Sequence, residues 1–153
     1  MNDADRKIYE NALPAVELRR QARGLALREP GYAEGRGADR EAAVRAFNTA
    51  SWTSPLRDLV GCASADVAAA LDSTAAAHQA AVGRYYTWSG LADDNYAANQ
   101  QAASGPWARF PSPDPAIRAA AVLEAKNAIE PALTAADQAD DVLIALIEAR
   151  LAS

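Results

Sequence analysis

Apolar residues recur every three or four positions through most of this chain, which is the spacing of a buried face on an α-helix. A first stripe, within residues 3–28, consists of Ile8, Ala12, Val16 and Leu25, and Pro14 is expected to kink or restart its helix. The clearest stripe begins after Ser64, a good N-cap residue, and consists of Val67, Leu71, Thr74, His78, Val82 and Tyr85. No strand-like alternation bounded by hairpin turns is present, so the pattern predicts helices throughout.

Turn-forming residues divide this helical pattern. Residues 29–38 are rich in glycine, and residues 104–115 contain four prolines. A further break is expected at Trp88–Asp94, Pro131 is expected to kink or end a helix, and Thr134 with Asp137 resembles a capping box. The sequence thus predicts an all-α fold, an irregular bundle of about five to seven alanine-rich helices in a single domain, residues 1–153. Its expected parts are an N-terminal helical segment 3–28, a loop 29–38, central helices 39–103, a Pro-rich loop 104–115 and C-terminal helices 115–152.

Composition changes this picture in one respect, because the expected core is thin. Alanine supplies about a quarter of the chain, far above its average usage, and buries much less apolar surface than the larger aliphatic residues. We therefore expect the protein to depend on self-association or on a protein partner. The formal net charge of -5 argues against a nucleic-acid partner, because such binding requires neutralisation of phosphates.

The N-terminal residues contain no apolar stretch of the kind found in a signal peptide, and no apolar run is long enough to cross a bilayer. We expect no membrane partner and a cytoplasmic location at synthesis, with a virion as a possible destination. The single cysteine, Cys62, cannot form an internal disulfide.

Candidate chemistry is sparse. His78 lies on the apolar stripe, where it is either a general base or a half-buried histidine that bonds to a carbonyl or hydroxyl group. The acidic pairs Asp93–Asp94 and Asp140–Asp141 are each expected near the start of a helix, where negative charge is favourable. No spacing matches a metal site, a phosphate loop or a nucleophile motif. The prediction is therefore no catalytic residue, no metal and no cofactor.

Aromatic residues concentrate in one part of the chain. Six of them fall within the 26 residues 85–110, and they form either a local hydrophobic cluster or a surface that docks on a partner. The last helix is the most apolar segment and is a second candidate for contacts. The predicted partner-contact residues are Tyr85, Trp88, Tyr96, Trp107, Phe110, Leu143, Ile147 and Leu151.

Trp88-Ser-Gly90, followed by Tyr96 eight positions after the tryptophan, resembles the Trp-x-Gly turn of the small helical hairpins exported by type VII secretion systems. The similarity covers about ten residues. It implies a helix–turn–helix at this point, whereas the helix expected after the turn is shorter than in that family and no C-terminal export signal follows.

Together these features favour a non-enzymatic helical structural or interaction subunit of a larger bacterial or phage assembly. The most specific version of this hypothesis is a virion component, either capsid-associated or head–tail joining. The alternative is a small cytoplasmic or type VII-secreted helical binding module or regulator. A third reading is an enzyme that uses His78 with Tyr85 or a carboxylate.

Overall fold

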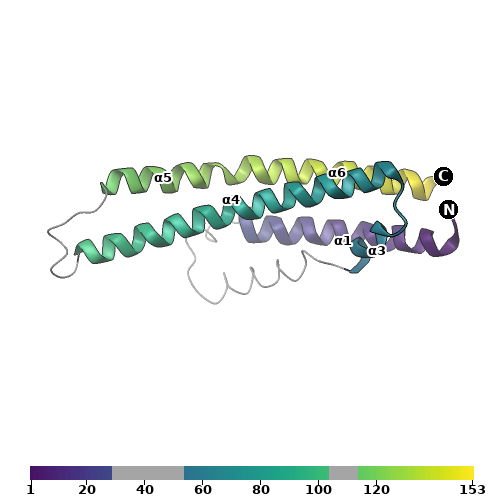
Figure 1. Cartoon of the computed structure of the whole chain (residues 1–153), viewed down its shortest axis with the longest axis horizontal. Coiled ribbons are helices and arrows are strands. Elements are labelled where there is room, and N and C mark those ends of the chain that lie inside the picture. Colours follow the sequence, from purple (N-terminus) through teal and green to yellow (C-terminus); the bar gives the residue numbers. More distant parts are fainter. Residues whose placement is uncertain (29–53, 104–113) are drawn as a thin grey trace.

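The computed structural model describes residues 1–28, 54–103 and 114–153 (Figure 1). Within these residues, 92% are helical and none is in a strand, which confirms the all-α prediction. The helices are α1 (Asp3–Arg28), α3 (Ser54–Val60), α4 (Ala65–Ala103), α5 (Pro115–Asn127) and α6 (Ile129–Ala152). Since Ala128 alone separates α5 from α6, the described residues form four separate helical rods, fewer than the five to seven predicted.

The long helices lie side by side, with the two chain ends at the same end of the bundle (Figure 1). Helix α6 packs closely on both α1 and α4, and α3 packs on the first half of α1. Beyond the end of α1, α4 and α5 continue as a pair, which we call the α4–α5 arm (residues 90–103 and 115–127). Among the residues that the structure describes, the bundle therefore has a thick end, which carries the termini, and an end formed by two helices.

Two helix starts follow from local chemistry. The side chain of Asn2 accepts a hydrogen bond from the Asp5 backbone N–H at 2.7 Å and so caps the start of α1. Asp114 caps α5: its carboxylate accepts from the Ala116 N–H at 2.9 Å, and proline occupies the first helical position.

The restart expected at Pro14 and the break expected at Trp88–Asp94 are wrong. Helix α1 continues through Pro14, because the buried side chains of Ala12 and Val16 on either side of it hold the helix against the bundle. Helix α4 runs for 39 residues, about 58 Å, because Trp88 packs into the bundle and holds the helix there. Trp88–Gly90 is therefore not the Trp-x-Gly turn that the resemblance implied.

The expected capping box at Thr134 is also wrong, because Thr134 lies inside α6. The break falls at Ala128, and Pro131 occupies the first turn of α6. Proline lacks an N–H for the residue four positions before it and clashes with that residue's carbonyl. That residue is Asn127, where α5 ends.

The core consists of two separate apolar clusters. The first lies at the thick end and joins α1, α3, the start of α4 and the end of α6; it contains Tyr9, Ala12, Ala15, Val16, Leu56, Leu59, Val67, Ala70, Leu143 and Ile147. The second joins the middle of α4 to the start of α6 and contains Ala81, Tyr85, Trp88, Ile129, Leu133 and Ala136. Between the two clusters, along all three long helices, the buried positions are polar.

Candidate functional site

The buried residues between the two apolar clusters form a layer of charged and polar side chains, which we call the polar layer: Arg19, Arg23, Thr74, His78 and Asp140. Each lies on the stripe of its helix that faces the interior. On α6, for example, Asp140 is four residues after Ala136 and three before Leu143, and both neighbours are fully buried. Helical periodicity therefore directs these side chains inward.

Asp140 is the centre of the layer and is completely buried. Its Oδ1 accepts from Arg19 Nη2 at 3.2 Å and from the hydroxyl of Thr74, and its Oδ2 accepts from Arg23 Nη2 at 2.6 Å. Both carboxylate oxygens are thus engaged by charged or hydroxyl donors. A buried carboxylate is tolerated only with such partners, because an isolated charge in an apolar interior is very unfavourable.

His78 occupies the α4 side of the layer. Its Nδ1 lies 3.3 Å from Arg23 Nη1, and because a guanidinium can only donate, Nδ1 is the acceptor and the ring proton is on Nε2. Burial, together with the positive charges of Arg19 and Arg23, lowers the pKa of His78 from 6.5 to about 4. The histidine is therefore neutral at pH 7 and accepts from Arg23, a partner that differs from the carbonyl or hydroxyl group expected from the sequence.

Ion pairs continue from the layer to the surface between α1 and α6. Asp137 accepts from Arg23 Nη2 at 2.6 Å and from Arg28 Nη2 at 3.3 Å. Burial raises the pKa of Asp137, but the bonds and charges of these two arginines outweigh that effect and hold it below its usual range. At the exposed edge, Arg20 pairs with Asp141 at 2.5 Å, and Arg28 pairs with Glu130 at 3.1 Å.

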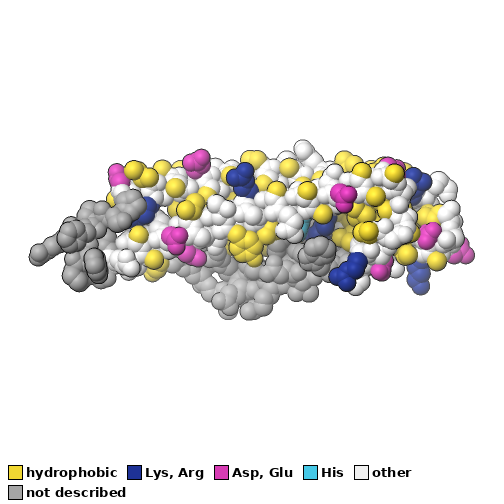
Figure 2. Space-filling model, in the orientation of Figure 1, with side chains coloured by type: hydrophobic (Ala, Val, Ile, Leu, Met, Phe, Trp, Pro, Cys, Tyr) yellow, Lys and Arg dark blue, Asp and Glu magenta, His cyan; other side chains and the backbone are white. Residues whose placement is uncertain are grey.

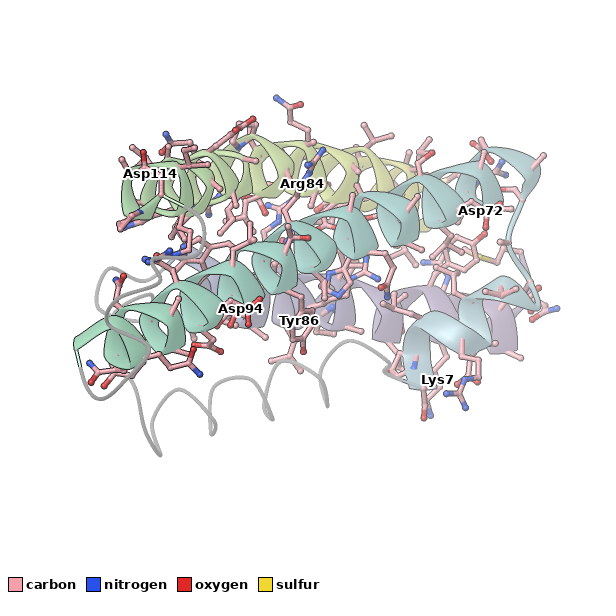
Figure 3. All side chains as sticks on the ribbon, turned by 60° about the vertical axis from the view of Figure 1, so that its left-hand side comes forward. Lys7, Asp72, Arg84, Tyr86, Asp94 and Asp114 are labelled. Atoms are coloured by element: carbon pink, nitrogen blue, oxygen red, sulfur yellow. The ribbon has the colours of Figure 1, made fainter. Side chains whose placement is uncertain are left out.

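Arg19 and Arg23 also link α1 to α4. These two helices approach each other less closely than either approaches α6, and Figure 3 shows nitrogen-bearing side chains between their ribbons. Arg19 Nη2 reaches Thr74 Oγ1 of α4 at 3.1 Å, and Arg23 reaches His78. In an alanine-rich bundle, long arginine side chains fill a gap that alanines would leave empty.

We interpret the polar layer as a device that fixes the register of α1, α4 and α6. Alanine-lined surfaces pack in several registers with similar energies, whereas sliding one helix by a turn would leave Arg23 or Asp140 unpaired among apolar side chains. That outcome is strongly unfavourable. The Nε atoms of Arg19 and Arg23 are buried without a hydrogen-bond partner, so pairing within the layer is incomplete. Among the described residues no cluster of histidine, cysteine and acidic side chains is arranged to hold a metal ion.

The structure places the predicted contact residues in different environments. Tyr85, Trp88, Leu143 and Ile147 are buried in the two apolar clusters, so within this chain they are core residues. Leu151 is partly buried against the first cluster. Tyr96 is 49% exposed on the α4–α5 arm, while Trp107 and Phe110 lie outside the described residues. Of the two readings of the aromatic segment, the local cluster applies to Tyr85 and Trp88, whose ring centroids are 5.6 Å apart.

The sequence prediction missed the polar layer. The first stripe was assigned to Leu25, which is 59% exposed, whereas the buried positions that follow Val16 are Arg19, Arg23 and Ala26. Asp140 was expected to complement a helix N-terminus but is a buried ion-pair partner in the middle of α6. The available signal was charged residues at core spacing: two arginines on one helix and one aspartate on another.

Comparison with known proteins identifies no relative. No protein-family model matches the chain, and no match was found among curated proteins or among solved structures. Within the described residues, no helix is both long and apolar enough to span a membrane. Functional interpretation therefore depends on the surfaces and on the layer themselves.

Proposed function

We propose that this protein is a non-enzymatic helical interaction subunit of a larger assembly, and that it contacts its neighbours through the α4–α5 arm. The observation that carries the proposal is the contrast between α5 and α6. Helix α5 has no buried residue, although it continues directly into α6, which has six. A helix with no buried face gains little from tertiary packing, which supplies most helical stability in proteins.

The apolar side chains of the arm support this proposal. Ile117 is 65% exposed and Leu123 is 58% exposed on α5, and Leu91 is 36% exposed on α4. Figure 2 shows hydrophobic side chains along the edge of the molecule formed by α5 and α6. Exposed apolar side chains occur on other helices as well, but on the arm they accompany a helix with no buried residue of its own, a combination that favours a protein–protein contact.

Side-chain hydrogen bonds nevertheless hold the two helices of the arm together, so that a partner would meet them as a pair. Arg118 of α5 donates to the side-chain oxygens of Asn95 at 3.2 Å and Asn99 at 2.8 Å on α4. Val122 and Ala125 pack against the second apolar cluster but are only partly buried, as is Ala121. A third or fourth helix laid against this pair would complete the burial of these positions, as in a four-helix bundle.

The composition of the chain indicates the kind of assembly that we propose. An alanine-rich and arginine-rich composition favours a bacterial or phage assembly, and a capsid-associated or head–tail joining virion component is the form that we propose first. A small cytoplasmic or secreted binding module would present the same arm to a single partner.

The test combines solution mass with hydrogen exchange. We expect light scattering over a dilution series to give a mass above 16.1 kDa that falls on dilution, and Ile117→Asp to lower it. Val142→Asp is the matched control, because Val142 is also exposed (56%) but lies on α6, away from the arm. A monomer whose α5 amides exchange much faster than those of α6 would support a different protein as the partner. A monomer with α5 as well protected as α6 would overturn the proposal.

A further inference from the structure

The α4–α5 arm begins where the core ends on both of its helices. On α4, Trp88 and Ser89 are the last buried residues, and none of residues 90–101 is buried. On the other side of the arm, Ile129 is the first buried residue of α6, and α5 before it has none. The body of the bundle therefore holds both helices up to one level and holds neither of them beyond it.

Helix α4 has a weak point at this level. Kinks in helices occur mostly at proline and at adjacent glycine and serine residues, and α4 has Ser89-Gly90 at the start of the arm. A Cβ added at Gly90 would meet no described atom within 4 Å outside its own stretch of helix, so close packing is not what requires glycine there. What glycine supplies at this position is backbone freedom that other residues lack.

The second weak point is the join between α5 and α6. Pro131 has no N–H, so the carbonyl of Asn127 cannot receive the helical hydrogen bond from that position. The backbone N–H of Ala128 is shared between the carbonyls of Glu124 and Ala125, at 3.2 and 3.3 Å. The ladder of helical hydrogen bonds is therefore incomplete over about one turn, and a helix bends most easily at such a place.

The two weak points lie at the same level of the arm. Arg118 of α5 donates to Asn95 and Asn99 of α4, and the two helices run in opposite directions (Figure 1). Gly90 lies five residues before Asn95 and nine before Asn99. Since both helices rise by about 1.5 Å per residue, Gly90 is level with residues 123–127, directly before the join of α5 and α6. The bonds of Arg118 also tie the two helices together beyond that level, so they move as one unit.

We infer that the α4–α5 arm is a rigid pair of helices that swings on a hinge formed by Ser89-Gly90 and residues 127–131. Hinges consist of a few residues that absorb the change in φ and ψ, while the parts on either side keep their internal contacts. The existence of the hinge does not depend on the proposed function. Its use rests on that function, because a swinging arm allows one copy of the subunit to meet its neighbours at more than one angle.

Residual dipolar couplings of the backbone amides, measured on the ¹⁵N-labelled full chain in a dilute aligning medium, test the hinge. We expect α1 and α6 to share one alignment and both helices of the arm to share a second, weaker one, with an order parameter S² below the ~0.85 of rigid backbone. Measuring the Ile117→Asp variant beside the wild type keeps the arm free of a second copy, so the result does not depend on the mass that tests the proposed function.

Two substitutions stiffen the hinge and also raise helix propensity, so neither is expected to unfold the chain. Gly90→Ala and Pro131→Ala should each strengthen the alignment of the arm, and the double variant should bring it to that of the body. The matched control is Gly83→Ala. Gly83 is also a glycine of α4 with open space at its Cβ position, but it lies within the bundle, between the buried Ala81 and Tyr85. This change should leave the arm as mobile as before.

A single alignment for the body and the arm in Ile117→Asp would overturn the inference. So would an alignment that weakens gradually towards the end of the arm, or on α5 alone, since that result describes fraying and not a rigid swing. An unchanged arm in the double variant, or an equal effect of Gly83→Ala and Gly90→Ala, would show that residues 89–90 and 127–131 do not form the hinge.

Discussion

Replacing Asp140 with asparagine tests the interpretation of the polar layer most directly. The substitution keeps the size of the side chain but removes the negative charge that Arg19 Nη2 and Arg23 Nη2 contact at 3.2 and 2.6 Å. Two guanidinium groups, 6% and 0% exposed, would then remain in the interior with their central counter-charge gone. Breaking a buried ion pair in this way typically destabilises a protein by about 3–5 kcal/mol, a large part of the ~5–15 kcal/mol by which a domain is stable.

The neighbouring position provides the control. Asp141 follows Asp140 on α6, but its side chain is 67% exposed. It pairs with Arg20 of α1 at 2.5 Å on the surface. Pairs of exposed charges contribute about 0–1 kcal/mol, so Asp141→Asn should change stability by no more than that. Urea denaturation followed by circular dichroism at 222 nm compares both variants with the wild type. If Asp140→Asn lies within about 1 kcal/mol of Asp141→Asn, the reasoning about the layer is refuted.

A triple variant separates the effect of leaving buried arginines unpaired from the effect of removing the buried charges altogether. In Arg19→Met, Arg23→Met and Asp140→Leu combined, no charged member of the layer is left unpaired, and replacing a buried ion-pair network by apolar residues is often neutral or stabilising. We expect it to recover most of the stability that Asp140→Asn loses. If the layer also fixes the register, the triple variant should show more than one set of amide resonances. A single, sharp set would contradict the register interpretation.

Three further changes test other parts of the structure. Because the pKa of His78 is lowered to about 4 in the folded chain, the unfolded chain takes up a proton first as the pH falls; stability is complete above pH 6.5 and declines towards pH 4, by at most about 3 kcal/mol. His78→Asn, which retains an acceptor, should flatten the difference between denaturation at pH 7 and pH 5, and an unchanged slope would contradict the assignment. Pro14→Ala should stabilise the chain by about 1–3 kcal/mol by restoring the hydrogen bond to Glu10 inside α1, and a lower midpoint in urea would show that α1 needs the proline. Trp88→Ala should lose about 3–5 kcal/mol, because the side chain is only 5% exposed, whereas a loss below 1 kcal/mol would show that the second apolar cluster contributes little.

The local signals that were read correctly depend on neighbouring residues alone. Asp114-Pro115 predicts a helix start because cap and proline act within one turn, and the stripe from Val67 to Tyr85 indicates one buried face because periodicity is a property of the helix itself. Their outcomes in the structure match: the helix starts at Pro115, and Val67, Thr74, His78 and Tyr85 are buried.

The errors arose where packing between helices outweighs a local preference. Gly90 weakens a helix locally, yet α4 continues because Trp88 and Ser89 are buried against the rest of the bundle. Arg23 reads as a surface residue by its type, and its burial becomes evident only when Asp140, 117 positions away, is brought beside it. No pattern within a single helix contains that information.

The position of the polar layer has a consequence for how the molecule opens. Because the layer separates two apolar clusters, the chain has two regions that lose their packing at different costs, as cooperative units in native-state hydrogen exchange do. The first cluster joins four helices and is closed by Arg6, which donates to the Leu151 carbonyl at 3.0 Å. The second is built mainly on α4 and α6 and leads to an arm with no buried residue on α5. Opening should therefore begin at the arm and stop at Asp140, leaving the end with the termini folded while the other end is free to rearrange.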